Sequence, residues 1–103
     1  MYRARVHFFP KTMEAYREVL ETAGEWNKLC AEKGWVQATY WTPTVGGFEI
    51  VAEYDYPDLA TYQRQMEEGY AEPRAMAIMQ KLTAMESTRP HYAELLNTIS
   101  ISR

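Results

Sequence analysis

The chain has 103 residues, of which 47% are hydrophobic and 24% charged, so residues 1–103 are expected to form one small globular domain. Eleven lysines and arginines against fourteen aspartates and glutamates give a net charge of −3. This balance argues against a nucleic-acid or anionic-membrane surface, because both partners require a field of positive charge.

The single cysteine, Cys30, cannot form an internal disulfide, which is typical of an intracellular protein. The N-terminal stretch MYRARVHFFPK has no apolar core of the length that a signal peptide needs. Uninterrupted apolar runs are only a few residues long, too short to cross a membrane. We therefore expect a cytoplasmic protein without a membrane segment.

Residues 2–9 alternate between an apolar set that starts at Tyr2 and a more polar set that starts at Arg3. This alternation predicts a β-strand with one apolar face. Pro10 ends the predicted strand, and Thr12 is placed to cap the helix that follows.

Residues 13–33 have the apolar spacing of a long helix, and Gly34 is placed to end it. The predicted buried stripe consists of Met13, Tyr16, Val19, Leu20, Ala23, Trp26 and Cys30. The glutamates of this segment are expected to form a solvated face. Cys30 is expected to be a small buried hydrophobe, since nothing around it in the sequence supplies the cationic setting of a reactive thiol.

Two further strands are predicted at residues 35–42 and 48–56, with the segment TPTVGG between them. A phosphate-binding glycine loop runs from a strand into a helix, whereas Gly46 and Gly47 lead from one strand to the next. The glycines therefore predict a hairpin turn in which they supply positive backbone angles.

The Pro57-Asp58 pair breaks the chain, and Asp58 is placed to cap a second helix. Its apolar stripe consists of Leu59, Tyr62, Met66 and Tyr70. Gly69 interrupts this helix, and a further helical segment is expected to begin at Pro73. It carries Met76, Ile78, Met79, Leu82 and Met85.

A fourth strand is predicted at residues 91–101. The resulting order β-α-β-β-α-β is the split unit of the ferredoxin-like fold, an α+β architecture with a four-stranded antiparallel sheet. In this topology strands 2–9 and 48–56 are central neighbours.

The sheet face turned away from the helices then carries a mixture of cations, carboxylates and aromatic rings. It consists of Arg3, Arg5 and His7 beside Glu49, Glu53 and Asp55, with Trp35, Gln37, Thr39 and Trp41 on one register of residues 35–42. The charges can neutralise one another across strands, but the aromatic rings are poorly suited to water. A second copy of the sheet could cover this face.

The stretch YWTPTVGGFEIVAEYDYPDLATY, the order of the elements and the two-part second helix resemble the dimeric α+β barrel superfamily. This superfamily includes the antibiotic-biosynthesis monooxygenase (ABM) and NIPSNAP-type domains. EIVAEYDYPDLATY is similar to the NIPSNAP stretch in which a strand ends in an acidic and aromatic segment before a D-L-A-x-Y helix start. The resemblance covers nearly the whole chain. It implies a homodimer whose two sheets form a barrel, with a ligand cavity between sheet and helices in each protomer.

No metal and no cofactor is expected. The two histidines, His7 and His91, belong to no H-x-H or H-E-x-x-H pattern, and no cysteine pair is present. Some relatives of the barrel bind haem through a histidine of the second helical segment, but residues 58–86 contain no histidine. Tyr62 and Tyr70 are the remaining candidate iron ligands there, and nothing in the sequence favours them.

A set of aromatic and methionine side chains is predicted to lie between the sheet and the helices, where it could hold a flat apolar molecule. The candidate ligand contacts are Tyr40, Trp41, Tyr54, Tyr62, Met66, Tyr70 and Met79. Tyrosine hydroxyls would orient the ligand. The same side chains could instead fill the core, since stripes of this kind usually do.

Three functions are consistent with this pattern. The favoured one is a small homodimer that binds a small hydrophobic or aromatic molecule. The resemblance implies a second, a cofactor-independent monooxygenase, or an isomerase or cyclase, acting on a phenolic or polyketide-like substrate. The third is a structural or stress-associated dimer without a ligand. Asn27 and Asn97 lie in no obvious catalytic motif, so no catalytic residues are assigned.

Overall fold

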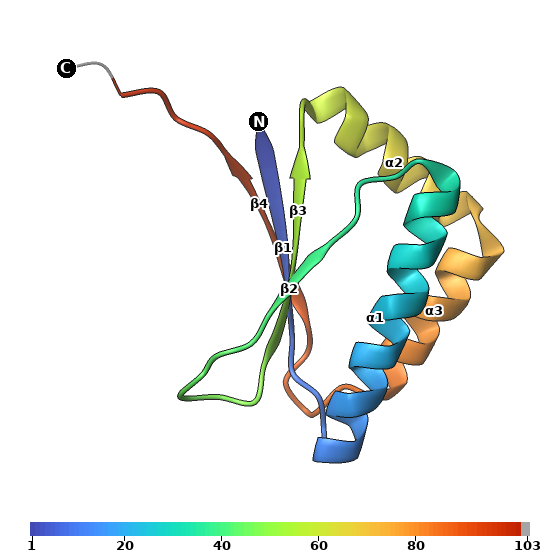
Figure 1. The fold of residues 1–103 in the computed structure, drawn as a ribbon, viewed down its shortest axis with the longest axis vertical. Helices are drawn as coiled ribbons and strands as arrows, with labels where there is room; N and C mark the ends of the chain where they lie inside the picture. Colours follow the sequence, from blue (N-terminus) through green and yellow to red (C-terminus); the bar gives the residue numbers. More distant parts are fainter. Residues whose placement is uncertain (102–103) are drawn as a thin grey trace.

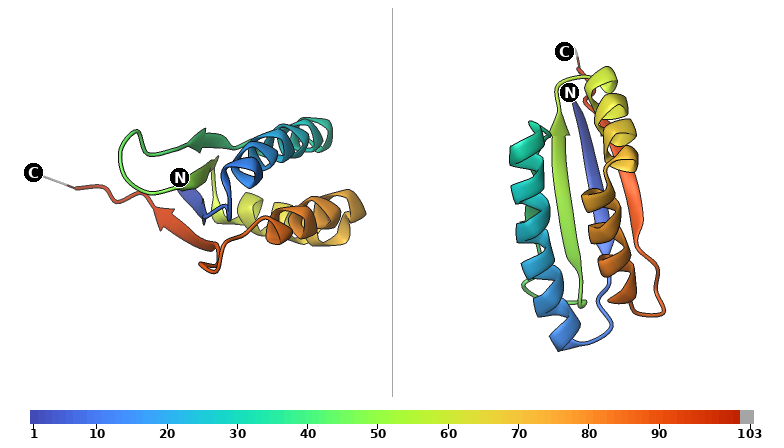
Figure 2. Two further views of the ribbon diagram at one scale, coloured as in Figure 1. Left: turned by 90° about the horizontal axis from the view of Figure 1, so that it is seen from below. Right: turned by 90° about the vertical axis from the view of Figure 1, so that its right-hand side faces the viewer.

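The computed structural model describes residues 1–101, so the last two positions of the predicted domain lie outside the described residues. The elements are β1 (Tyr2–Phe8), α1 (Met13–Lys33), β2 (Thr39–Trp41), β3 (Ile50–Tyr56), α2 (Leu59–Ala71), α3 (Pro73–Ala84) and β4 (Tyr92–Asn97) (Figure 1). The strands form an antiparallel sheet in the order β2-β3-β1-β4. All three helices cover the same face of this sheet (Figure 2). The predicted ferredoxin-like α+β fold is confirmed, with β1 and β3 at its centre.

The helices begin and end at the predicted signals. The side chains of Thr12 and Asp58 each accept a hydrogen bond from the backbone N–H three residues on, at 3.0 and 2.7 Å. Gly34 ends α1 in the left-handed conformation, with φ of 71°, which a residue without Cβ adopts at little cost. Pro73 begins α3, where its missing N–H would have no helical partner.

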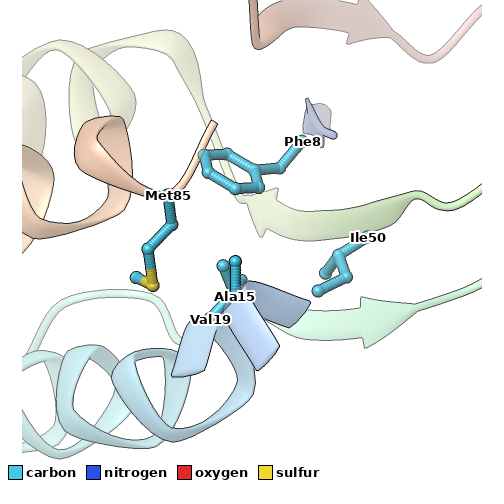
Figure 3. Close-up of a cluster of buried hydrophobic side chains, with 5 residues drawn as sticks. All are labelled: Phe8, Ala15, Val19, Ile50 and Met85. Carbon is cyan, nitrogen blue, oxygen red and sulfur yellow. The ribbon is translucent and has the colours of Figure 1, made fainter. Parts of the chain in front are cut away.

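One core cluster joins the lower half of the sheet to α1 and to the end of α3. Figure 3 shows Phe8 of β1 and Ile50 of β3 pointing toward Ala15 and Val19 of α1, with Met85 closing the cluster. A second cluster lies near the other end of α1 and consists of Leu29, Cys30, Trp35 and Ala75. Cys30 is buried, as predicted, and burial raises the pKa of its thiol to about 11.

The face that α1 turns inward differs from the predicted stripe. Met13 and Leu20 were expected inside but are 58% and 44% exposed, whereas Thr22 is fully buried. Thr22 can be buried at little cost because its hydroxyl donates to the Glu18 carbonyl at 2.8 Å. The inward face is therefore built from smaller side chains than the hydrophobic spacing indicated.

The second strand is shorter than predicted, because residues 35–38 do not pair with the sheet. The Val36 N–H donates to the side-chain oxygen of Gln65 at 2.9 Å. Both backbone groups of Ala38 bond to the Asn27 amide, each at 3.1 Å. Side chains of α1 and α2 thus satisfy backbone groups that a neighbouring strand would otherwise satisfy.

Gly46 and Gly47 lie in the connection between β2 and β3, as predicted. The connection spans residues 42–49, so it is a longer loop and not a tight turn. Gly46 has a positive φ of 118°, while Gly47 does not adopt a positive φ. The Thr42 hydroxyl donates to the Glu49 carbonyl at 2.8 Å and closes the base of the loop. The other three strands are also shorter than predicted, since β1 ends at Phe8, β3 begins at Ile50 and β4 spans Tyr92–Asn97.

Ile50→Ala is expected to lower the free energy of unfolding by about 2–5 kcal/mol, because it leaves a cavity in the cluster of Figure 3. Leu20→Ala is the matched control, and its half-exposed side chain predicts a change within about 0.5 kcal/mol. Urea unfolding followed by circular dichroism measures both. Equal losses in the two variants would contradict the described orientation of α1.

Candidate functional site

A cavity of about 280 Å³ lies between the sheet and the helices. Its wall is predominantly apolar and is drawn from every helix and from three strands. The lining residues are Ala4, Val6, Trp26, Trp35, Tyr54, Tyr56, Tyr62, Gln65, Met66, Gly69, Tyr70, Ala75, Met76, Met79, Ala93, Glu94 and Leu95. A cavity lined by apolar side chains and about half this size holds benzene in another protein, so this one has room for a molecule of two or three rings.

The floor of the cavity follows from the pairing of β1 with its two neighbours. Ala4 of β1 lies opposite Tyr54 of β3 on one side and Leu95 of β4 on the other. Because side chains alternate along a strand, Ala4, Tyr54 and Leu95 all face the helices. The small alanine leaves open the space into which the two larger neighbours project.

Two tryptophans form the wall on the side of α1. The rings of Trp26 and Trp35 lie 6.0 Å apart at an angle of 40°. On one predicted register Trp35 would lie on the outer face of the sheet, but it is buried and lines the cavity. The hydrogen bonds that hold residues 35–38 against α1 and α2 explain the difference, as does the bond from Trp35 Nε1 to Glu68 Oε2 at 3.3 Å.

The opposite side of the cavity opens to solvent along α2 and α3. No described residue of α2 is buried, and Tyr70, Met79 and Met66 are 68%, 44% and 37% exposed. Exposed flexible methionines and a large ring at the entrance are suited to contact with an apolar molecule. Together with Leu95 of the edge strand β4, which is 41% exposed, these residues form the exposed part of the lining.

Five of the seven residues predicted to contact a ligand line this cavity, and two do not. The five are Tyr54, Tyr62, Met66, Tyr70 and Met79. Tyr40 instead packs against the core cluster of Figure 3. Trp41 lies on the opposite face of the sheet, opposite Val51, and is 58% exposed. Whether any of the seven binds a ligand stays a prediction.

Sequence reasoning did not assign Trp26, Trp35 or Tyr56 to the site, although all three line it. Tyr56 could have been found, because it follows Tyr54 by two residues on the same strand and therefore shares its face. Trp35 gave no such signal, since its position depends on side-chain hydrogen bonds from two helices.

Two of the cavity tyrosines, Tyr54 and Tyr56, are held in their neutral form. Burial raises the pKa of Tyr56 to about 12, and burial raises the pKa of Tyr54 above its ordinary value as well. At neutral pH both hydroxyls are therefore hydrogen-bond donors as well as acceptors. The lining contains no lysine, arginine or histidine among the described residues, so the site supplies no positive charge.

The outer face of the sheet carries the ion pairs that the sequence predicted. Arg3 binds Asp55 through two hydrogen bonds, from Nε to Oδ1 at 2.7 Å and from Nη2 to Oδ2 at 3.1 Å. Arg5 Nε donates to Glu53 Oε2 at 3.0 Å. These hydrogen bonds from Arg3 hold the pKa of Asp55 below its usual range.

His7 lies at the centre of a more enclosed group on the same outer face. Its Nδ1 and Nε2 atoms lie 2.7 and 2.5 Å from the carboxylates of Glu49 and Glu94. The imidazole stacks on Tyr92, with ring centroids 4.4 Å apart. Burial disfavours the charged ring, but the two carboxylates outweigh burial and raise the pKa of His7.

Elsewhere, His91 contacts the Glu86 carboxylate. Within residues 1–101, no group of three histidine, cysteine, aspartate or glutamate residues is placed to hold a metal ion. No described helix combines the length and apolarity needed to span a membrane.

Comparison with known proteins gives a likeness of fold. No family of known sequences matches the chain, and no curated protein does. A crystal structure of an antibiotic biosynthesis monooxygenase is similar with a TM-score of 0.75 and 14% identity, over 97% of this chain and 100% of the other. A NIPSNAP domain protein from Burkholderia xenovorans has a TM-score of 0.76 and 16% identity, over 100% and 99%.

A monooxygenase of Streptomyces coelicolor in complex with the ligand nanaomycin D is similar with a TM-score of 0.69 and 20% identity, over 99% of this chain and 90% of the other. The predicted resemblance to ABM and NIPSNAP proteins is thus confirmed at the level of the fold, which is what likenesses at these identities show.

The His7 group predicts a pH-dependent stability. Because the folded protein raises the pKa of His7 above its ordinary value of about 6.5, the stabilisation is complete below that pH and is lost as pH rises through the raised pKa. The free energy of unfolding of the wild type should therefore fall as the pH rises above about 6.5, and His7→Gln should remove this fall. Urea unfolding of both proteins across this pH range measures the effect. If their free energies of unfolding change with pH in parallel, His7 does not contribute to the pH dependence of stability.

Proposed function

We propose that this protein binds a small, neutral, hydrophobic or aromatic molecule in the cavity between its sheet and its helices, and that it does so as a homodimer. The observation that carries the first part is the cavity itself, with its volume of about 280 Å³ and its wall of aromatic, methionine and alanine side chains. Ligand pockets are mostly apolar concavities with a few polar groups, and this one has that composition. We also propose that residues 1–103 act as a single domain in the cytoplasm.

Second copies of this chain are suited to cover the outer sheet face. That face exposes Trp41, Tyr92 and Leu96 by 58%, 45% and 39% beside the ion pairs. The arginines are already bound to carboxylates within one chain, so burying the face would leave few charges without a partner. A partner with the same paired face therefore avoids the cost of burying isolated charge, and the exposed rings supply the apolar area.

Binding is favoured over catalysis by the state of the tyrosines. A general base acts best when its pKa lies near the working pH, but burial moves the pKa of Tyr54 and Tyr56 upward, away from neutrality. What supports a cofactor-independent monooxygenase as a second candidate is the fold that the chain shares with monooxygenases, one of them in complex with a ligand. Oxygen uptake with a phenolic or anthrone-like substrate is the corresponding measurement.

Gly69→Leu is expected to abolish binding by occupying the cavity, because Gly69 lines it and a Cβ added there would enter open space. For the wild type, a two-ring phenol at 100 times its dissociation constant should add about 2.7 kcal/mol to the free energy of unfolding. Thermal unfolding with and without 2-naphthol and related phenols and quinones measures this effect.

Gly24→Leu is the matched control, since it replaces another helical glycine with open space around it but lies outside the cavity. Both substitutions should favour the helix itself by a similar amount. Stabilisation of wild type and Gly24→Leu, with none in Gly69→Leu, is the expected pattern. No stabilisation of the wild type by any compound of the panel would defeat the binding proposal.

The dimer is tested by placing a charge on the outer face. Trp41→Glu should give a monomer at micromolar concentration, because an unpaired carboxylate would be buried between the two sheets. Met13→Glu on α1 is the control, as Met13 is equally exposed, at 58%, but lies on the helical side. Sedimentation velocity distinguishes the two states, and a wild type that sediments as a monomer would contradict the proposal.

A further inference from the structure

The charges of the outer sheet face fall into two groups, of which the first is balanced. Arg3 is bound to Asp55 and Arg5 is bound to Glu53, so two cations meet two carboxylates. All four side chains keep their charge at any pH near neutrality. This part of the face therefore has the same charge whatever the protonation state of its surroundings.

The second group consists of two carboxylates, Glu49 and Glu94, with only His7 between them. The His7 side chain is 15% exposed, and its Nδ1 and Nε2 atoms lie 2.7 and 2.5 Å from oxygens of Glu49 and Glu94. A neutral imidazole carries a single N–H, so it can donate to only one of the two carboxylates. Both contacts are satisfied as hydrogen bonds only when the three groups together hold one additional proton.

The elements around His7 supply no further cation to this group. Tyr92 of β4 stacks on the imidazole, and the three residues of β2 are uncharged. Arg89 lies over the Phe9 ring, 3.8 Å from its centroid, and within residues 1–101 it forms no ion pair with either carboxylate. Burial alone would lower the pKa of His7, but the two carboxylates outweigh burial and raise it.

We propose that His7, held between Glu49 and Glu94, makes the outer sheet face a proton-dependent docking surface for a second copy of this chain. This inference rests on the homodimer of the proposed function and adds its regulation. With the additional proton the group carries one net negative charge, and without it two, so losing the proton doubles the unbalanced charge that a dimer must bury. Tyr92 covers the imidazole and is 45% exposed, so a partner that packs on this ring also encloses His7.

The direction of the effect follows from the charges. Docking is favoured while the proton is held, so the dimer is tightest at low pH and weakens as the pH rises through the pKa of His7, which lies above its ordinary value of about 6.5. The stability of a single chain is predicted to change in the same direction. Only the effect on docking depends on the presence of a second copy, so a dissociation constant separates the two.

The test measures the dimer dissociation constant of the wild type by sedimentation velocity over a concentration series at about pH 6 and about pH 8. We expect the constant to rise by about tenfold to 100-fold, because a pKa difference of one unit changes an equilibrium tenfold and each of the two copies carries one such group. Circular dichroism at both pH values verifies that the protein stays folded.

His7→Gln should remove this pH dependence, because its amide side chain stays uncharged across the range. His91→Gln is the matched control and should retain the dependence. His91 is the other histidine of the chain, and it contacts Glu86 and stacks on Phe8 of the core cluster.

Glu94→Gln gives a signal that a change of packing alone would not produce. The amide can donate to one nitrogen of a neutral imidazole while the other nitrogen donates to Glu49, so the additional proton is no longer needed. Its dissociation constant at about pH 8 should therefore lie below that of the wild type. Asp55→Asn is the matched control: it also removes a carboxylate of this face but leaves the His7 group intact, so it should keep the wild-type ratio between the two pH values.

The outcomes separate the inference from the function on which it rests. If the wild type dimerises equally well at both pH values, or more tightly at the higher one, the role of His7 is overturned and the dimer stands. Loss of the pH dependence in His91→Gln instead of His7→Gln would overturn it equally. If the wild type is a monomer at both pH values, the inference and the proposed dimer fall together.

Discussion

The antiparallel register of β1 against β3 is the constraint on which both faces of this protein depend. Ala4 pairs with Tyr54 and Arg5 pairs with Glu53, so neighbouring pairs send their side chains to opposite sides of the sheet. A shift of one residue would bring the ion pairs under the helices and the cavity floor into solvent. The burial cost of unpaired charge and the loss of apolar contacts both oppose such a shift. One alignment therefore positions the cavity and the charged outer face together.

Local patterns were sufficient to predict the fold, because they are read within a few residues. The helix ends are set by hydrogen bonds to nearby backbone groups at Thr12, Asp58 and Gly34. The alternation of apolar and polar residues in β1 and β3 can likewise be recognised without knowing the partner strand. Leu20 was predicted to be buried on α1 but is half-exposed, while Thr22 is buried in the inward face. Hydrophobicity alone did not show this, because Thr22 can be buried only by donating its hydroxyl hydrogen to the Glu18 carbonyl. Residues 35–38 were incorrectly predicted to be part of the strand for a related reason. The amide side chains of Asn27 and Gln65, distant in the sequence, bond their backbone in place of a strand partner.

The site was predictable where a residue lies on a long regular element and unpredictable where it depends on a short one. Tyr54 follows the alternation of β3, and Met66 follows the helical repeat of α2, so both were correctly expected on the cavity side. β2 has only three residues, and its faces are set by its pairing with β3. Trp41 lies opposite Val51 and therefore points outward, a fact that the sequence of β2 by itself does not contain.

The small residues of the lining give the strongest argument that the cavity has a use. Ala4, Ala75 and Ala93 contribute small side chains to the wall of the cavity. Empty apolar volume lowers stability, and a domain of 103 residues has little stability to lose. Substitutions that fill such a cavity are among the easiest ways to stabilise a protein. A purely structural dimer would gain from them, whereas a protein that binds a ring system in this cavity would lose its ligand. The open cavity is therefore an argument for the proposed ligand binding over a purely structural role.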